Sequence, residues 1–323
     1  MHTLIESIEA AASIGIGGHV RPDGDCVGSC LALCYYLKKK YPNKTVNVYL
    51  EYVQDEFKFL PNSGLVKNEV SSSDLTKYDV FISLDCGDID RLGFSEKLFH
   101  LAINTINIDH HVTNQEFAAF NYVVPEASST CEVLMDILDW EQLDRELASA
   151  LYLGIVHDTG VFKHSNTTPK TMELAAKLIT YDVPFSKIID ETFYQKTYLQ
   201  NQILGRCLLE SFMVLDGKCI VSYVKKYIMD FYGASANDLD GVIDQLRVTK
   251  GVEVAILIHE TGPQIYKVSM RSNHDVDVSR IAGIYGGGGH VKAAGCTMTG
   301  TIYDVINNIT VHIDEQLNKR NRS

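Results

Sequence analysis

Residues 13–40 read SIGIGGHVRPDGDCVGSCLALCYYLKKK, and this stretch decides the fold. The apolar segment Ser13–Val20 predicts a strand, and Cys26–Lys40 predicts an amphipathic helix. Pro22 and Gly24 are turn formers, so the aspartates between the two elements project from a tight loop where the strand ends. This is typical of an α/β sheet, which binds ligands at the carboxyl ends of its strands.

The same alternation continues along the first part of the chain. Further strands are predicted at Val46–Leu50, Asp79–Asp85 and Asn104–His110. Ser129 with Glu132 three residues later predicts a capping box for a helix that runs to Trp140, and Thr168 followed by Pro169 predicts the start of another helix. We therefore expect a mainly parallel sheet flanked by helices.

The second part predicts a smaller α/β unit. Its elements are the strands Cys219–Val224, Val252–His259 and Tyr266–Arg271, a helix at Asn237–Arg247, a glycine run at 286–289 and a last helix after Tyr303. A helical stretch between the two parts is typical of a connector. We predict a catalytic domain at 1–185, a helical linker at 186–215 and a second domain at 216–323.

The charge of the chain is distributed unevenly. The formal net charge is −12, from 29 Lys and Arg against 41 Asp and Glu, which argues against broad binding of long nucleic acid. Residues 1–215 hold 17 basic and 29 acidic residues, whereas residues 216–323 hold 12 of each. An acidic first part suits cations, and a neutral second part suits anions.

The cysteines and the hydropathy pattern predict a soluble, cytoplasmic protein. The eight cysteines form no C-x-x-C pair, and we assign them no function. No apolar run reaches the length of a membrane span, and no signal segment is evident at the start of the sequence.

Acidic and imidazole side chains recur where the predicted strands end. They are His19, Asp23 and Asp25 after the first strand, Asp85 after a second, and Asp109, His110 and His111 after a third. Taken singly, each has an ordinary explanation: Asp25 as a helix N-cap, Asp85 as a turn residue, His110 as a hydrogen-bonded histidine. Together they concentrate negative charge at one sheet edge, which calls for cations.

Oxygen and imidazole ligands suit manganese or magnesium, and less selectively cobalt or zinc. A pair of such ions holds the attacking and leaving oxygens in phosphoryl chemistry, with a bridging water as the nucleophile. Asp158, in H-D-T-G, ends a predicted helix from Asp144 and is a candidate for the last carboxylate, although Gly160 makes an ordinary helix terminus equally compatible with the sequence. The D-T-G motif does not indicate an aspartic protease, because it follows a helical stretch and occurs once.

The second part carries candidates for phosphate binding. Arg271, Ser272 and Asn273 form R-S-N, and the run G-G-G-G-H includes Gly288, Gly289 and His290. Glycines let backbone amides converge on an anion, and Arg and His supply donors. Walker, G-x-S-x-G and H-E-x-x-H motifs are absent from the sequence, which excludes the corresponding enzyme classes.

These motifs, in this order, resemble the DHH/DHHA1 phosphoesterase family over nearly the whole chain. The likeness rests on H-V-R-P-D-G-D-C-V-G-S, the strand to Asp85, D-H-H at 109–111, H-D-T-G and G-G-G-G-H. It implies a DHH domain followed by a DHHA1 domain, and two manganese ions for which magnesium or cobalt could substitute. One ion would be held by His19, Asp23 and Asp85, and the other by Asp25, Asp85, His110 and Asp158.

The resemblance also implies the remaining roles. His111 would contact the scissile phosphate, Asp109 would support it, and Asp85 would bridge the ions. Substrate phosphate would be recognised by Arg271, Ser272, Asn273, Gly288, Gly289 and His290.

Within this family the short build resembles the bifunctional nanoRNase (oligoribonuclease) and pAp phosphatase type. That type implies a manganese-dependent exoribonuclease and 3′(2′),5′-bisphosphate nucleotidase, whose partners are short RNA, pApA or pAp. Two alternatives stay open, a cyclic di-AMP or pApA phosphodiesterase and a nucleotide sensor without catalysis. A homodimer also stays open, and no membrane is expected.

Overall fold

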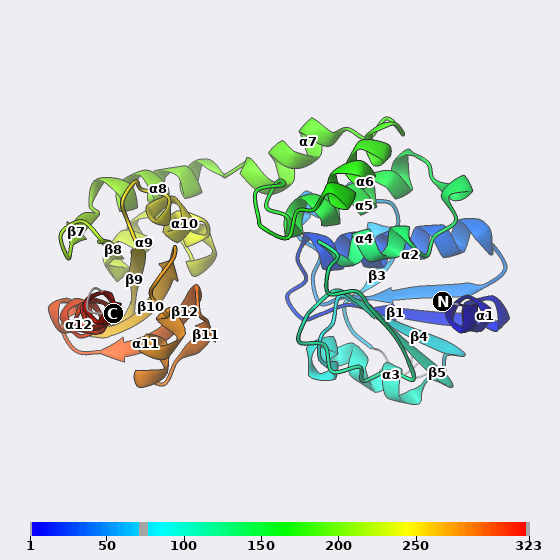
Figure 1. Ribbon diagram of the computed structural model, residues 1–323, viewed down its shortest axis with the longest axis horizontal. Coiled ribbons are helices and arrows are strands. Elements are labelled where there is room, and N and C mark those ends of the chain that lie inside the picture. Colours follow the sequence, from blue (N-terminus) through cyan, green and yellow to red (C-terminus); the bar gives the residue numbers. More distant parts are fainter. Residues whose placement is uncertain (1, 71–76, 321–323) are drawn as a thin grey trace. The chain divides into compact units, whose positions relative to one another are not determined.

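The computed structural model describes residues 2–70 and 77–320, and two compact units divide the chain between Gln195 and Lys196 (Figure 1). The division falls inside the segment that we predicted to be a linker. The helix α7 (Phe185–Ile189) and a π-helix (Asp190–Tyr194) both belong to the first unit. The helix α8 (Tyr198–Leu209) packs in the second unit.

The first unit contains a parallel sheet of six strands in the order β3-β2-β1-β4-β5-β6. The strands are β1 (Ser13–Gly17), β2 (Thr45–Tyr49), β3 (Val66–Lys67), β4 (Val80–Leu84), β5 (Asn104–Asp109) and β6 (Phe120–Val123). This is the doubly wound order, in which chain direction across the sheet switches between β1 and β4. The predicted fold class is confirmed.

Helices cover both faces of this sheet. They are α1 (His2–Ala10), α2 (Gly24–Lys40), α3 (Glu96–Leu101), α4 (Thr130–Met135), α5 (Arg145–Asp158), α6 (Pro169–Ile179) and α7, with 3₁₀ turns at Asp55–Phe57 (η1), Ser63–Leu65 (η2), Ile89–Ser95 (η4) and Trp140–Gln142 (η5). In Figure 1, α2, α4 and α5 lie on one side of the sheet and α3 on the other. The main apolar core lies between the sheet and the first group, and a smaller aromatic core lies under α3.

The second unit contains a mixed sheet of six strands, in the order β11-β12-β10-β9-β8-β7. Its strands are β7 (Phe212–Val214), β8 (Cys219–Val224), β9 (Val254–Gly262), β10 (Ile265–Ser272), β11 (Gly288–His290) and β12 (Ala293–Thr299). Its helices are α8, α9 (Lys226–Tyr232), α10 (Val242–Arg247), α11 (Val278–Ile284) and α12 (Ile302–Arg320), with a 3₁₀ turn at Ala236–Leu239. Among the described strands of this unit, β8 and β9 pair in parallel and the other pairs are antiparallel.

Three local predictions were wrong. The helix after Ser129 ends at Met135 rather than Trp140, and Glu132 turns its carboxylate to Ser128 and Thr171 instead of closing a capping box. The predicted helix at 237–247 is interrupted at Gly241, whose φ of 80° only glycine adopts readily. The first strand ends at Gly17, because residues 18–23 already form the loop that carries the ligands. In the described residues, no helix is long and apolar enough to cross a membrane.

Candidate metal centre

The candidate ligands lie at the switch point of the parallel sheet. His19 follows β1 and Asp85 follows β4, the two strands at which the strand order reverses. Asp109 ends β5, and His110 and His111 follow it. A crevice forms outside the carboxyl ends of the strands at such a point. The topology therefore brings together three segments that are far apart in the sequence.

The two aspartates of the D-G-D loop, Asp23 and Asp25, accept hydrogen bonds from different helix starts. Asp23 caps α2, because its Oδ1 accepts hydrogen bonds from the amides of Asp25 and Cys26, both at 3.1 Å. Asp25 is not the cap that its position suggested. Its carboxylate is fully buried and accepts from the amides of Thr130 at 2.6 Å and Cys131 at 3.0 Å, at the start of α4.

Asp85 lies between two histidines. His19 Nε2 is 3.4 Å from Asp85 Oδ2, and His110 Nε2 is 3.6 Å from Asp85 Oδ1. Each imidazole thus faces a different oxygen of one buried carboxylate. Asp85 also has a φ of 58°, an uncommon conformation that tends to persist at functional sites. This geometry suits a carboxylate that bridges two cations.

Both histidines present a ring nitrogen to the cluster. His19 Nδ1 lies 2.9 Å from the carbonyl of Val20, and His110 Nδ1 lies 3.3 Å from the carbonyl of Ala127. Each Nδ1 therefore carries the proton, and in the neutral ring Nε2 keeps a lone pair, as in metal-ligating histidines. His110 Nε2 is buried and makes no hydrogen bond with described residues, although Asp158 Oδ2 is 3.0 Å away.

The electrostatics of the cluster favour positive charge. Burial and the charges of Asp85 and Asp158 raise the pKa of Asp25 well above its ordinary value. Burial opposes protonation of His19 and His110, but Asp23 and Asp85 raise the pKa of His19, and the nearby aspartates raise that of His110 to about 10. The carboxylates are thus stabilised by protons or by bound cations.

Among the described residues, three overlapping groups of side chains could hold a metal. Within each group the ligand atoms lie within 4.8 Å of one another: His19, Cys26 and Asp85; Asp85, His110 and His111; and Asp25, His110 and Asp158. Burial raises the pKa of Cys26 well above its ordinary value, so its thiol stays neutral, and only thiolate is a good ligand. Asp23 Oδ2 lies 3.7 Å from His19 Nε2, at the edge of the first group. The donors fit hard divalent cations.

His111 is oriented differently from the two buried histidines. Its Nδ1 donates to Asp109 Oδ1 at 2.7 Å, which raises the pKa of His111. Asn114 Nδ2 donates to the other oxygen of Asp109 at 2.6 Å. The side chain of His111 is 42% exposed, so Nε2 is available to an incoming group, while Asp109 is fully buried.

Sequence reasoning missed the residues that support the ligands. Thr130 donates its hydroxyl to Asp85 Oδ1 at 3.0 Å and its amide to Asp25, so the start of α4 holds two candidate ligands. The N-cap at Ser129 could be recognised in the sequence as the start of a helix. The contacts of that helix start with Asp25 and Asp85 could not. On α5, a Cβ added to Gly154 would lie 2.4 Å from Asp25 Oδ1.

His157 packs against Gly24 of the D-G-D loop. Its Nε2 donates to Thr192 Oγ1 at 2.9 Å, and its ring contacts the edges of Phe57 and Phe193. A Cβ added to Gly24 would lie 2.2 Å from Cγ of His157. Burial lowers the pKa of His157 to about 4, so the ring is neutral at pH 7.

In the second unit, Arg271 and His290 flank one small residue. Arg271 on β10 and His290 on β11 both pair with Ala293 on β12. Directly paired residues of antiparallel strands point to the same face, and the Cα atoms of Arg271 and His290 lie about 10 Å apart across two strand spacings. The Arg271 guanidinium donates to the Met270 carbonyl at 3.2 Å, and its Nε lies 3.9 Å from Asp244 Oδ1. Gly289 pairs closely with β12, where a Cβ would lie 2.4 Å from the Ala293 carbonyl.

Ser272 and Asn273 are engaged within the second unit. The Ser272 hydroxyl donates to the carbonyl of Val276 at 2.7 Å, and Asn273 bonds Arg247 and Val252 with its amide group. Gly288 and His290 are exposed. Substrate contacts of Ser272 and Asn273 therefore stay a prediction, and both residues also hold the end of β10.

Comparisons with known proteins follow the same division of the chain. The profile described as "DHH family, N-terminal domain" matches residues 13–155, and the profile of the "DHHA1 domain" matches residues 216–319. A protein of Thermus thermophilus named bifunctional oligoribonuclease and PAP phosphatase NrnA is 30% identical over 94% of this chain and 90% of its own. The chain belongs to the DHH family.

Other proteins are similar to this DHH protein over nearly its whole length. A Bacillus subtilis protein with the same name is 26% identical over 91% of this chain and 92% of its own. The crystal structure of an exopolyphosphatase-related protein from Bacteroides fragilis superposes with a TM-score of 0.87 at 23% identity, covering 97% of this chain and 95% of that one. That likeness concerns the fold. Membership makes the chain a phosphoesterase whose acidic and histidine clusters could hold metal.

Proposed function

We propose that this protein hydrolyses short oligoribonucleotides to mononucleotides, and pAp to AMP, with the help of two divalent cations. The observation that carries the proposal is Asp85, a buried carboxylate whose two oxygens face His19 and His110. The names of the Thermus and Bacillus relatives, bifunctional oligoribonucleases and PAP phosphatases, support this substrate class.

The ligands divide into two sets that share Asp85. His19, Asp23 and Asp85 would hold one ion, and Asp25, Asp85, His110 and Asp158 the other. Manganese is the proposed metal, with magnesium or cobalt as substitutes, because the donors are carboxylate and imidazole. Such ions, when bound, lower the pKa of water and neutralise charge on the phosphate.

His111 and Asp109 would act on the reacting phosphate. The hydrogen bond to Asp109 favours the imidazolium form of His111, whose Nε2–H can donate to a phosphate oxygen on which charge accumulates. Asp109, held by Asn114 on its second oxygen, fixes the ring. In this assignment His111 stabilises charge and His110 holds metal.

Arg271 and His290 would bind a substrate phosphate in the second unit. Their spacing over Ala293 leaves room for a compact anion between a guanidinium and an imidazole. Gly288 and Gly289 add backbone amides on the edge strand β11. Recognition of a single terminal phosphate favours short substrates, since the acidic first part offers a long RNA no basic track.

A side-by-side assay tests the proposal. Purified protein with manganese is given pAp, pApA, a short RNA, a 24-mer RNA, cyclic di-AMP and pyrophosphate, and initial rates are compared. We expect the highest efficiencies with pAp and RNAs of two to about five nucleotides, falling toward the 24-mer, on the scale of single-strand site sizes. Rates that rise with length, or turnover of cyclic di-AMP alone, would contradict it.

A further inference from the structure

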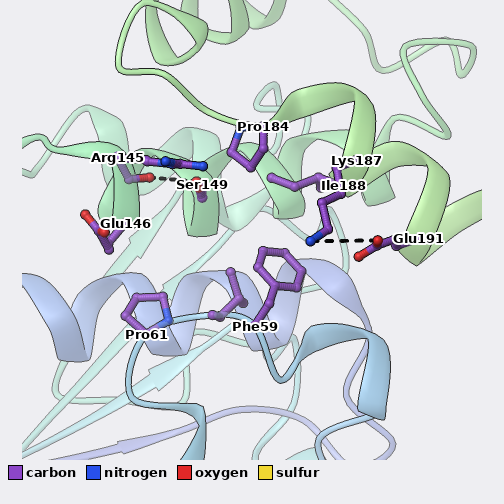
Figure 2. A pocket seen from close by; sticks show the side chains of 10 residues that line it. Phe59, Pro61, Arg145, Glu146, Ser149, Pro184, Lys187, Ile188 and Glu191 are labelled. Atoms are coloured by element: carbon purple, nitrogen blue, oxygen red, sulfur yellow. Dashed lines mark hydrogen bonds and ion pairs between the residues drawn. The ribbon is translucent and has the colours of Figure 1, made fainter.

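A pocket of about 270 Å³ lies in the first unit, away from the candidate metal ligands. Figure 2 shows its walls: Phe59, Leu60 and Pro61 from the segment after η1, Arg145, Glu146 and Ser149 from the start of α5, and Pro184, Lys187, Ile188 and Glu191 from α7 and the π-helix. Its volume is near the lower limit of small-molecule sites, so it admits one compact ligand.

Arg145 is the feature of this pocket that points to an anion. It is the exposed first residue of α5, and among the described residues no carboxylate, carbonyl or hydroxyl pairs with its guanidinium. Its backbone carbonyl accepts a hydrogen bond from the Ser149 hydroxyl at 2.6 Å, a contact that leaves the guanidinium unengaged. An unpaired arginine is notable in a unit with a large excess of acid, and guanidinium binds phosphate in a two-point geometry.

The opposite wall is apolar. Phe59 is 46% exposed, and Figure 2 shows its ring standing in the pocket across from Pro184. Pro61 lies on the same side as Phe59, and the buried Ile188 of α7 adds apolar surface across the pocket (Figure 2). A half-exposed aromatic ring bordered by prolines suits the face of a flat ring such as a nucleobase.

The charges of the lining limit the charge of the ligand. Lys187 Nζ lies 3.9 Å from Glu191 Oε1, so this lysine is already paired. Glu146 also lines the pocket, and its carboxylate can accept hydrogen bonds from sugar hydroxyls. Arg145 and Lys187 together balance Glu146 and Glu191, so the lining is neutral overall, which favours a phosphate monoester over a diphosphate or triphosphate.

We propose that this pocket is a second nucleotide site, which binds a nucleoside monophosphate with its phosphate on Arg145 and its base on Phe59. It is distinct from the hydrolytic site, because Arg145 precedes Asp158 by thirteen residues of one helix, or about 20 Å at 1.5 Å per residue. The proposal does not depend on the hydrolytic function, since a nucleotide can bind here without turnover.

Calorimetric titration of the full chain tests the proposal without catalysis. AMP is titrated into chelator-treated protein, which lacks divalent cations to bind phosphate at the cluster. Arg271→Ala and His290→Ala are introduced first, so that the proposed substrate-phosphate residues of the second unit do not add a second site. In this background we expect one saturable site that Arg145→Ala weakens about tenfold or more, as expected for loss of a charge-assisted bond to phosphate. Phe59→Ala should also weaken AMP but leave inorganic phosphate unchanged.

Matched variants separate this site from the metal cluster. Asp85→Asn and Arg280→Ala, the latter an exposed arginine of the second unit, should bind AMP as the wild type does. No measurable AMP binding, or binding that Asp85→Asn abolishes and Arg145→Ala leaves intact, would overturn the proposal. Equal affinity for AMP, adenosine and inorganic phosphate would overturn the two-part recognition.

Discussion

Gly154→Ala places one methyl group against the buried Asp25. The added Cβ would lie 2.4 Å from Asp25 Oδ1 and 2.3 Å from Cys131 Sγ, so the α5 backbone or the carboxylate must shift. Neither has free space, because Asp25 is fully buried and held by the amides of Thr130 and Cys131. The substitution therefore tests whether the position of Asp25 matters for metal binding, without changing any ligand.

The expected magnitude comes from three terms. Overpacking costs about 1–3 kcal/mol, and weakening a hydrogen bond to a charged carboxylate costs about 1.5–3 kcal/mol. Replacing glycine inside a helix returns about 1 kcal/mol. The free energy of unfolding should fall by roughly 1.5–5 kcal/mol, and metal affinity should fall about 10–100-fold, as when a group that orients a ligand is disturbed.

Urea unfolding, manganese titration and turnover of pAp measure these changes. Gly205→Ala is the matched control, because Gly205 lies inside α8 and an added Cβ there meets nothing within 4 Å. That variant should gain about 1 kcal/mol and keep its metal and its activity. Wild-type stability and manganese affinity in Gly154→Ala would refute the reasoning.

Four further outcomes are expected. Asp85→Asn should remove nearly all activity and reduce manganese content, because a neutral amide cannot bridge two cations. Elemental analysis and turnover measure this, and normal turnover would exclude the two-metal arrangement. His111→Ala should keep manganese but lose rate at saturating substrate, and loss of metal would mean that His110 and His111 have exchanged roles. Ala293→Leu should raise KM for pAp with little change in manganese affinity, since it fills the space between Arg271 and His290. The pKa of His157 is about 4 in the folded protein, against 6.5 ordinarily, so as pH falls the unfolded chain binds the proton first. The free energy of unfolding should therefore be unaffected by His157 above pH 6.5 and should fall by up to about 3 kcal/mol toward pH 4. Urea unfolding at several pH values measures this dependence, and His157→Phe should reduce it.

The sequence predicted the parallel sheet and the ends of its strands well, because β1, β4 and β5 are short apolar runs followed by polar residues. Such a pattern has few alternatives in an α/β chain. His19, Asp85 and Asp109 could be placed at one edge because parallel strands share their carboxyl end. This inference needed no tertiary contact beyond strand pairing.

The features that the sequence did not predict depend mainly on contacts between segments distant in sequence. Asp25 looked like an N-cap, yet Asp23 takes that task and Asp25 is held by the start of α4, more than one hundred residues away. The edge strand β11 is three residues long and rich in glycine, which carries no strand signal. The role of Gly154 follows only from the packing of α5 beside the D-G-D loop.

His157 gives the metal-binding loop a mechanical connection to the end of the first unit. Thr192, its hydrogen-bond partner, lies in a π-helix that ends at Tyr194, next to Gln195, the last residue of the unit. A π-helix is a rare element that occurs mostly as a single turn, frequently at functional sites. Rewinding it would withdraw Thr192 and release the imidazole that presses against Gly24. Asp23 and Asp25, on either side of Gly24, are thus packed through His157 onto the segment that ends the first unit.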